Sequence, residues 1–230
     1  MSDFLTGSSV FAVILTLAAY QVGLFLQKKW RSPLCNPILI AVILVMITLL
    51  IFDVPNTSYQ KGSVYLNYLL TPATICLAVP LYQQIQILRR HWLAILLGIL
   101  AGSLTCLVMI IVFAGIFRFD HTLFVSLLPK SVTTAMGMAL SEQAGGIGAI
   151  TTAAIIVTGI LGSLAGLPLA RLLKIDQPIA MGVAFGTSAH VIGTAKANES
   201  SELAGAVSSL SLVIAGILTA IVFPLLVQIY

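Results

Sequence analysis

Long apolar runs separated by short polar segments dominate the pattern of the chain. Five of these runs are uninterrupted, at residues 4–26, 34–54, 92–117, 146–170 and 204–229. Because a helix needs roughly 20 apolar residues to cross a hydrocarbon core about 30 Å thick, each run is long enough to span a bilayer. The pattern predicts five straight transmembrane helices.

Three further apolar stretches are interrupted near their middles. Residues 64–82 contain Pro72 and Pro80, residues 122–140 contain Pro129 followed by Lys130, and residues 178–197 contain Gly182, Gly186 and Gly193. Proline removes a backbone donor and clashes with the preceding turn, and glycine weakens a helix. We therefore expect three broken or re-entrant segments, with helix breaks at Pro72, Pro80 and Pro129. At membrane depth, unwound backbone is tolerated only against protein or a water-filled cavity.

Composition extends the membrane assignment to the whole chain. Of the 230 residues, 59% are apolar and 8% are charged, whereas a soluble domain uses about 25% charged residues. We expect an all-α polytopic membrane protein, with residues 1–230 forming a single integral membrane domain in the lipid bilayer. The net charge of +4 is small and spread over loops, which argues against a nucleic-acid partner. The sequence shows no acid–base pair, activated nucleophile, metal motif or nucleotide motif, so we expect neither an enzyme nor a metal or cofactor.

An offset of 57 residues relates the broken segments, because Pro72, Pro129 and Gly186 are equally spaced. Such internal similarity favours repeats. The repeat units are predicted at residues 64–120, 121–177 and 178–230.

The distribution of lysine and arginine bears on topology, because these residues collect on the cytoplasmic side of short loops. If all eight apolar segments span, they divide six against four. A re-entrant segment at 122–140 improves the asymmetry, with the N-terminus outside. If 178–197 is also re-entrant, the straight helices of successive repeats run in opposite directions, as in transporters built from inverted repeats with discontinuous helices. We expect a bacterial plasma membrane, and whether 122–140 and 178–197 span or re-enter stays open.

Lys130 is the one charge deep within an apolar segment. On insertion scales such a residue costs about 2.5 to 3.5 kcal/mol unless it is paired or hydrated. Ser131, Thr133 and Thr134 beside it offer hydroxyls but no carboxylate. A mobile anion would supply the missing partner, so these residues are candidates for substrate binding. The alternatives are a structural ion pair with Glu142 and a side chain that snorkels to the interface.

A second polar patch surrounds His190 in the stretch AFGTSAHVIGTAK. Gly186, Thr187, Ser188 and Gly193 make this part of an apolar segment small, polar and poorly suited to face lipid. These four residues and His190 are candidates for substrate binding. The imidazole of His190 titrates near neutral pH and could bind a carboxylate or carry a proton. The alternative is a histidine that is only hydrogen-bonded within the structure.

Helix restarts after the breaks provide a further way to hold an anion. A helix that begins after an interruption presents unpaired backbone N–H groups, which attract negative charge. Thr74 follows the break at Pro72, and Asn67 lies about one turn before it. Both residues are candidates for substrate binding. The alternative is that their polar groups only satisfy the interrupted backbone.

The chain resembles the bacterial LrgB/CidB family, whose plant relatives are the plastid glycolate/glycerate translocators. The resemblance covers nearly the whole chain and is carried by LLTPATICLAVPLY from Leu69, LLPKSVTTAMGMALSE from Leu127, AFGTSAHVIGTAK from Ala184 and AGAVSSLSLVIAGILTA from Ala204. Two departures stand out. The family usually has proline at the position of Ala135, and it usually reads GTASH where this chain reads GTSAH, which moves a hydroxyl from position 189 to Ser188.

The resemblance implies two functions. Bacterial members are described as holin-like or antiholin-like regulators of murein hydrolase activity and lysis that act with a small LrgA/CidA-type membrane partner, and plant members move small hydroxycarboxylates. The residues of this chain favour transport of a small carboxylate such as glycolate, glycerate, lactate or pyruvate, with or without a coupled proton. Lysis regulation is the alternative. The glycine pairs Gly98/Gly102 and Gly162/Gly166 allow close helix packing, which would suit a homodimer or packing within one chain.

Overall fold

The computed structural model describes residues 9–30, 37–69, 72, 75–76 and 78–230. It divides the chain into two compact units, Met1–Cys76 and Leu77–Tyr230, which are described separately. Across the described ranges the regular structure is helical, without a β-strand. This confirms the prediction of an all-α polytopic membrane protein. The prediction of a single membrane domain built from three repeats stays a prediction.

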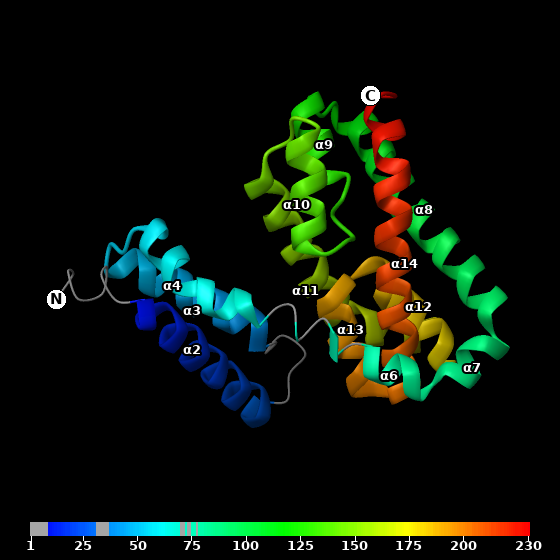
Figure 1. Ribbon diagram of the computed structural model, residues 1–230, viewed down its shortest axis with the longest axis horizontal. Helices are drawn as coiled ribbons and strands as arrows, with labels where there is room; N and C mark the ends of the chain where they lie inside the picture. The colour runs from blue at the N-terminus through cyan, green and yellow to red at the C-terminus, as the bar shows by residue number, and fades with distance from the viewer. Residues whose placement is uncertain (1–8, 31–36, 70–71, 73–74, 77) are drawn as a thin grey trace. The chain divides into compact units, whose positions relative to one another are not determined.

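The first unit contains α2 (Ser9–Trp30), α3 (Pro37–Ile51) and α4 (Asn56–Tyr68), and α2 packs against both other helices (Figure 1). Its small core consists of Ala19, Ala41 and Val45. The hydroxyls of Thr16 and Tyr59 are 2.8 Å apart and form a hydrogen bond that ties α2 to α4.

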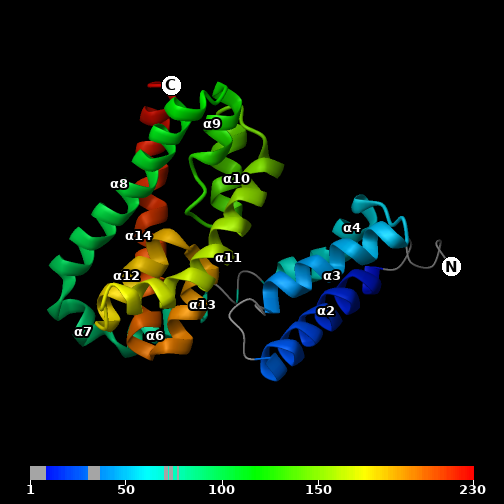
Figure 2. The same cartoon turned by 180° about the vertical axis from the view of Figure 1, so that it is seen from behind.

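The second unit is built around α14. Its helices are α6 (Ala78–Gln83), α7 (Ile85–Arg90), α8 (Trp92–Phe117), α9 (His121–Leu127), α10 (Thr134–Gln143), α11 (Gly148–Leu172), α12 (Pro178–Ser188), α13 (His190–Ser200) and α14 (Glu202–Val227). Helix α14 packs against α8, α12 and α13 (Figures 1 and 2). Helix α11 packs against α10 and α13.

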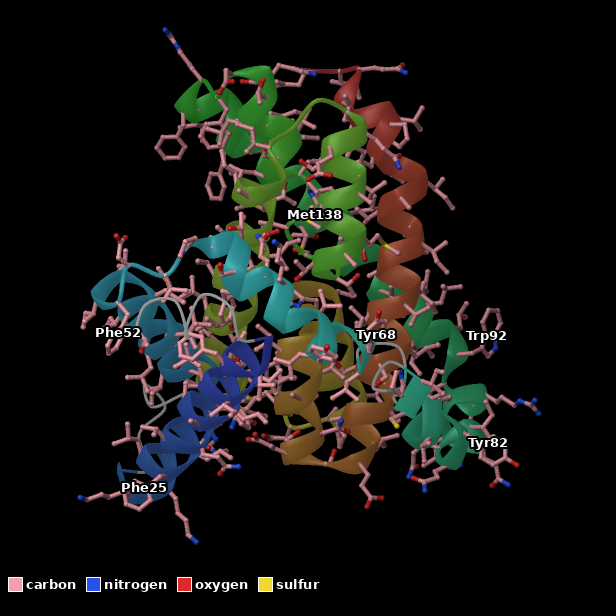
Figure 3. All side chains as sticks on the ribbon, turned by 60° about the vertical axis from the view of Figure 1, so that its left-hand side comes forward. Phe25, Phe52, Tyr68, Tyr82, Trp92 and Met138 are labelled. Carbon is pink, nitrogen blue, oxygen red and sulfur yellow. The ribbon has the colours of Figure 1, made fainter. Side chains whose placement is uncertain are left out.

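Four helices in the described part of the chain are long and apolar enough to cross a membrane, namely α2, α8, α11 and α14. At most 33% of the residues in their most apolar windows are buried, so most of their apolar surface is free to contact lipid. Side chains such as Phe25 and Trp92 point away from the ribbon (Figure 3). Helix α3 has 15 residues, which corresponds to about 22 Å at 1.5 Å per residue. Four of the five predicted straight spans therefore have full length.

The interruption at Pro129 lies where the sequence predicts it. Helix α9 ends at Leu127 and α10 begins at Thr134, with Pro129 buried in the turn between them. In the segment 64–82, α4 ends at Tyr68 and α6 begins at Ala78. Pro80 is not a break, contrary to the prediction. It lies within α6, which continues past it to Gln83.

The third interruption lies at Ala189 and His190, not at a glycine. Helix α12 ends at Ser188, α13 begins at His190, and His190 has a φ of 41°. Gly186 stays within α12, and α14 approaches it so closely that a Cβ there would collide with the carbonyl oxygen of Ser208. The same offset of 57 residues separates the first residues of α9 and α12, at positions 121 and 178.

The two glycine pairs are used for packing inside the chain. Cβ atoms at Gly98 and Gly102 would lie 3.2 Å from Val183 Cγ1 and 2.8 Å from Thr187 Oγ1, both on α12. A Cβ at Gly166 would collide with the ring of Phe185, which also lies on α12. These glycines therefore bring α8 and α11 against α12, and their presence in the sequence no longer argues for a dimer.

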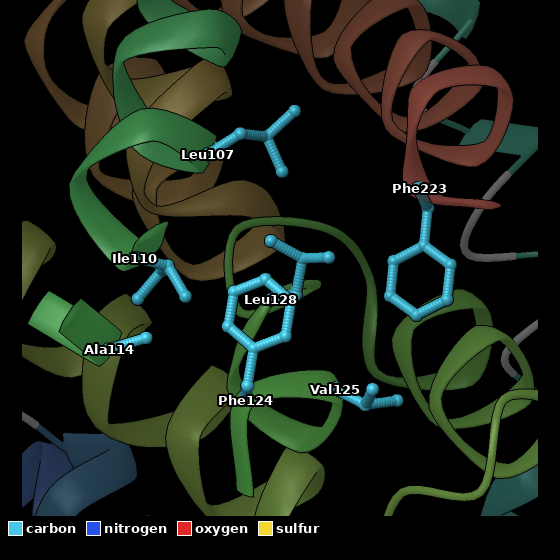
Figure 4. Packing of buried hydrophobic residues seen from close by; sticks show 7 residues of the cluster. All are labelled: Leu107, Ile110, Ala114, Phe124, Val125, Leu128 and Phe223. Carbon is cyan, nitrogen blue, oxygen red and sulfur yellow. The ribbon is translucent and has the colours of Figure 1, made fainter. Parts of the chain in front are cut away.

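An apolar cluster holds α9 against the long helices and so fixes the position of the turn at Pro129. Its buried members, drawn in Figure 4, are Leu107, Ile110, Ala114, Phe124, Val125, Leu128 and Phe223. They come from α8, from α9 and the residue after it, and from α14. Tyr230 stacks on Phe124 with ring centroids 4.4 Å apart, and its hydroxyl donates to the Phe119 carbonyl at 2.6 Å.

Candidate functional site

The turn between α9 and α10 presents Lys130. This residue is half-buried, and its Nζ donates a hydrogen bond to Ser131 Oγ at 3.3 Å. Among the residues that the structure describes, Lys130 has no carboxylate partner within 4.0 Å. The predicted alternative, an ion pair with Glu142, is therefore not formed. Lys130 is therefore a partly desolvated cation whose polar contact, among the residues that the structure describes, is the hydroxyl of Ser131.

The first residues of α10 follow this cation closely in the sequence. Thr133 is the N-cap of α10 with an extended backbone (φ −66°, ψ 150°), and its side chain makes no capping hydrogen bond. Thr133 and Thr134 are both half-buried. Three residues separate Lys130 from Thr134, where α10 begins, and both a helix N-terminus and an ammonium attract negative charge.

A small cavity adjoins the same turn and lies between α8, α12 and α14. It has a volume of ≈ 10 Å³, about the minimum that one water molecule needs. The lining residues are Ser103, Cys106, Leu107, Leu128, Ser131, Thr187, Ala215 and Thr219. Two predicted site residues, Ser131 and Thr187, therefore meet at this cavity although 56 positions separate them in the sequence.

Ser103 is distinctive among the cavity hydroxyls. Thr187 donates to the Val183 carbonyl at 2.8 Å, and Thr219 donates to the Ala215 carbonyl at 2.8 Å. Ser103 Oγ is the one buried side-chain oxygen or nitrogen in the described part of the chain that has no hydrogen-bond partner. A buried polar group without a partner costs about 1–3 kcal/mol. A water molecule or a solute hydroxyl in the cavity would relieve this cost.

His190 lies at the third interruption, between α12 and α13, and is 3% exposed. Its Nε2 lies 2.8 Å from the Ile155 carbonyl oxygen on α11, which makes Nε2 the hydrogen-bond donor. The following turn is fixed as well, because Thr194 Oγ1 lies 2.8 Å from Ser208 Oγ on α14. The charge of Lys130 acts electrostatically on His190, so the structure brings these two predicted residues near each other. The hydrogen bond to Ile155 is the one expected of a structural histidine.

The remaining predicted residues of the α12–α13 segment lie away from the cavity. Ser188 is exposed, and its hydroxyl donates to the Ala184 carbonyl at 2.6 Å. Ala189 is fully buried, so the hydroxyl that the family usually carries at this buried position lies on the exposed side in this chain. Gly186 contacts α14, and Gly193 lies against Ala189 and the Phe185 carbonyl. Both glycines serve packing.

Of the predicted residues of the segment 64–82, Pro80 lies in α6 of the second unit, and the others precede the boundary at Cys76. Pro72 is exposed. Asn67 is part of α4. Thr74 lies outside the described residues. The structure therefore brings Lys130, Ser131, Thr133, Thr134, Thr187 and His190 into one region of the second unit.

Three polar residues that line the cavity have no counterpart in the sequence-based prediction. Ser103 and Cys106 come from α8, and Thr219 comes from α14. Both helices have the pattern of ordinary spans, and a hydroxyl in such a helix usually bonds to its own backbone. No sequence signal distinguishes Ser103 from Ser211, whose hydroxyl donates to the Val207 carbonyl at 2.7 Å.

The difference in hydrogen bonding between Ser103 and Ser211 gives a prediction for stability. Replacing Ser103 with alanine should leave the free energy of unfolding unchanged or raise it by up to about 2 kcal/mol, because an unpartnered buried hydroxyl is removed. The matched variant Ser211→Ala should lower it by about 1 kcal/mol, because a made hydrogen bond is lost. Unfolding in mixed micelles measures both. A larger loss for Ser103→Ala than for Ser211→Ala would show that Ser103 has a partner in the folded protein.

Comparison with known proteins identifies the family. The sequence model of the LrgB-like family matches residues 16–229. The chain belongs to the LrgB-like family. It is 34% identical to the "Holin-like protein CidB" of Staphylococcus epidermidis, with all of both chains aligned. It is also 34% identical to the "Antiholin-like protein LrgB" of Bacillus subtilis, over 97% of each chain.

A further relative carries no functional name. The "Uncharacterized protein YxaC" of Bacillus subtilis is 34% identical over 96% of each chain. No solved structure matches the chain. The family assignment confirms the resemblance found in the sequence. The names of the relatives support the alternative expectation, a holin-like or antiholin-like role, better than the expectation of transport.

Proposed function

We propose that this protein is a holin-like or antiholin-like membrane protein that takes part in the control of murein hydrolase activity and cell lysis. The observation that carries this proposal is the similarity over the whole chain to relatives with these names. A bacterial plasma membrane with the N-terminus outside suits this role, as does a complex with a small holin-like membrane protein. The four long apolar helices support membrane integration.

Deletion of the gene tests the proposal. A strain that lacks the protein should show a changed rate of autolysis and changed murein hydrolase activity in the medium, and the intact gene should restore both. Affinity purification from solubilised membranes should recover a small membrane protein. Wild-type autolysis in the deletion strain, measured in growing and stationary cultures, would contradict the proposal.

Transport of a small carboxylate is the second candidate, and the geometry of the second unit favours it. Lys130 is a half-buried cation without a described carboxylate partner, and its contact Ser131 also lines the hydroxyl-rich cavity. A carboxylate could bind the ammonium while a hydroxyl or carbonyl group of the same solute bonds in the cavity. The ≈ 10 Å³ cavity is too small for such a solute, so transport would need the surrounding helices to separate. The two functions are compatible, since flux of carbon acids could feed into lysis control.

Exchange in proteoliposomes tests this second function. Purified protein should exchange labelled glycolate, glycerate, lactate or pyruvate faster than empty liposomes do, and a proton gradient should alter the rate if a proton is coupled. Exchange no faster than in protein-free liposomes for every one of these acids would exclude the carrier function.

Substitutions of two neighbouring hydroxyl residues, Thr187 and Ser188, test whether the cavity is part of the binding site. Thr187→Val keeps the shape of a buried side chain but removes the hydroxyl that lines the cavity, and it should lower exchange about tenfold, which corresponds to about 1.4 kcal/mol for one lost hydrogen bond. Ser188→Ala should leave exchange within about twofold, because surface substitutions usually change little and Ser188 is exposed outside the cavity lining. Equal loss in both variants would argue against the cavity as part of the binding site.

A further inference from the structure

A second and larger cavity lies where α11 ends. It has a volume of ≈ 390 Å³ and is lined by Leu167, Ala170, Arg171, Ile175, Asp176, Met181, Lys196, Glu199 and Ser200. This volume falls within the range of about 300–1,000 Å³ that is usual for ligand sites. The cavity shares no residue with the hydroxyl-lined cavity, so it is a separate feature of the second unit.

The charges in this cavity are of both signs and only partly paired. Lys196 Nζ lies 2.5 Å from Glu199 Oε2, so these two charges neutralise each other. Arg171 and Asp176 make no ion pair with any residue in the described ranges. Both are exposed. The cavity therefore offers one free cation and one free anion to a ligand.

The cavity also has an apolar wall, and its place at the end of a spanning helix sets its position relative to the membrane. Leu167, Ala170 and Met181 are half-buried in its wall. Arg171 is in the last turn of α11, a helix long and apolar enough to cross a membrane, which ends at Leu172. The end of a spanning helix lies at the boundary between hydrocarbon and headgroups. A ligand of this cavity can therefore place its polar part on the charges and its apolar part along the wall.

We propose that this cavity binds the headgroup of a zwitterionic amino-phospholipid of the phosphatidylethanolamine type. The guanidinium of Arg171 matches the geometry of a phosphate and can bond to two of its oxygens. The carboxylate of Asp176 complements the ammonium of the same headgroup. A purely anionic headgroup would satisfy Arg171 but leave Asp176 near a like charge, so the free pair selects a ligand that carries both signs. The inference goes beyond the proposed function and does not depend on it.

Lipid titration of the purified full-length chain tests the proposal. The protein is delipidated in detergent and titrated with phosphatidylethanolamine or phosphatidylglycerol of the same acyl chains, and binding is followed by native mass spectrometry and by the thermal unfolding midpoint. Phosphatidylethanolamine should bind at least about tenfold more tightly than phosphatidylglycerol. Asp176→Asn should remove this preference and weaken phosphatidylethanolamine binding by about tenfold or more, the effect of losing one charged contact. Arg171→Gln should weaken the binding of both lipids by a similar factor, because both carry the phosphate that the guanidinium binds.

Lys174→Gln is the matched control. Lys174 lies three positions after Arg171, is exposed and does not line the cavity, so its variant loses the same charge at the same end of α11. It should bind phosphatidylethanolamine as the wild type does. Unfolding midpoints measured without lipid show whether each variant is folded, and the exposed positions of Arg171 and Asp176 predict that all are.

Three results would overturn the proposal. Equal affinity for both lipids would mean that the headgroup is not selected. An equal loss in Lys174→Gln would mean that only the general charge of this helix end matters. Binding of soluble phosphoethanolamine as tight as that of the whole lipid would mean that the ligand is a small zwitterion. This test measures lipid binding and neither autolysis nor carboxylate exchange. Its failure is therefore distinct from failure of the proposed function.

Discussion

Replacement of Lys130 with methionine should lower the exchange of small carboxylates in proteoliposomes by about 10- to 100-fold. A hydrogen bond to a charged group contributes about 1.5–3 kcal/mol, and each 1.4 kcal/mol is a factor of about ten in affinity. The stability of the protein should not fall, because the variant removes a half-buried cation that has no described carboxylate partner and replaces it with an apolar side chain of similar length. Initial exchange rates and unfolding in the same detergent measure the two effects.

The control for this prediction is Lys61→Met. Lys61 is exposed on α4, so its variant removes the same charge without touching the turn at Pro129, and exchange should stay near the wild-type rate. Wild-type exchange by Lys130→Met would contradict the role of this cation in transport. Complementation of a deletion strain with Lys130→Met separates the two functions, because restored autolysis control without exchange would assign the lysine to transport alone.

Gly186→Ala should destabilise the protein by about 3 kcal/mol, at the upper end of what overpacking usually costs. A Cβ at this position would meet the Ser208 carbonyl oxygen and, at 2.7 Å, the Cβ of Ser211. Both groups belong to the rigid helix α14, so α12 would have to move away as a unit. The displacement would also separate Thr187 from the other residues of the hydroxyl-lined cavity. The unfolding midpoint in mixed micelles is the measurement.

Gly115→Ala is the control for this substitution. Gly115 lies in α8, and a Cβ there would have no atom within 4 Å. Because alanine favours a helix over glycine by about 0.5–1 kcal/mol, this variant should be as stable as the wild type or slightly more stable. If Gly186→Ala behaves like Gly115→Ala, the close packing of α12 on α14 is not needed for the fold.

The membrane helices are predictable from sequence to within a few residues. The predicted span 92–117 and helix α8 (Trp92–Phe117) have the same bounds, because length and apolarity together decide whether a segment can cross a bilayer. The break at Pro129 is also found where the sequence predicts it, since proline cannot continue a helix interior without losing a hydrogen bond. These features depend on local chemistry.

Breaks attributed to glycine are less predictable. Gly186 remains helical and packs against α14, and the chain is interrupted at His190, whose backbone is left-handed. Glycine weakens a helix only slightly, so tertiary packing decides whether the helix continues. Pro80 is equally ambiguous in sequence, because proline ends some helices and only kinks others, and here it lies within α6.

The candidate site is partly visible in the sequence. Lys130, Ser131 and Thr187 are polar residues in apolar surroundings, and this pattern alone makes them candidates. Ser103 and Thr219 lie in segments that have the composition of ordinary spans, and serine and threonine in such helices commonly bond to their own backbone. Which of these hydroxyls faces a cavity depends on the rotation and packing of four separate segments.

The sequence by itself determined that this chain is an α-helical membrane protein, where its long spans lie, that one segment is broken at Pro129, and that it belongs with the LrgB-like proteins. These conclusions follow from composition, from hydrophobic length and from the covalent limits of proline. Only the tertiary structure decided that Lys130 has no carboxylate partner among the described residues and that the glycine pairs pack within one chain. It also decided that Ser103 faces a cavity and that its hydroxyl has no hydrogen-bond partner. Each of these depends on contacts between helices distant in sequence, which local propensities do not specify.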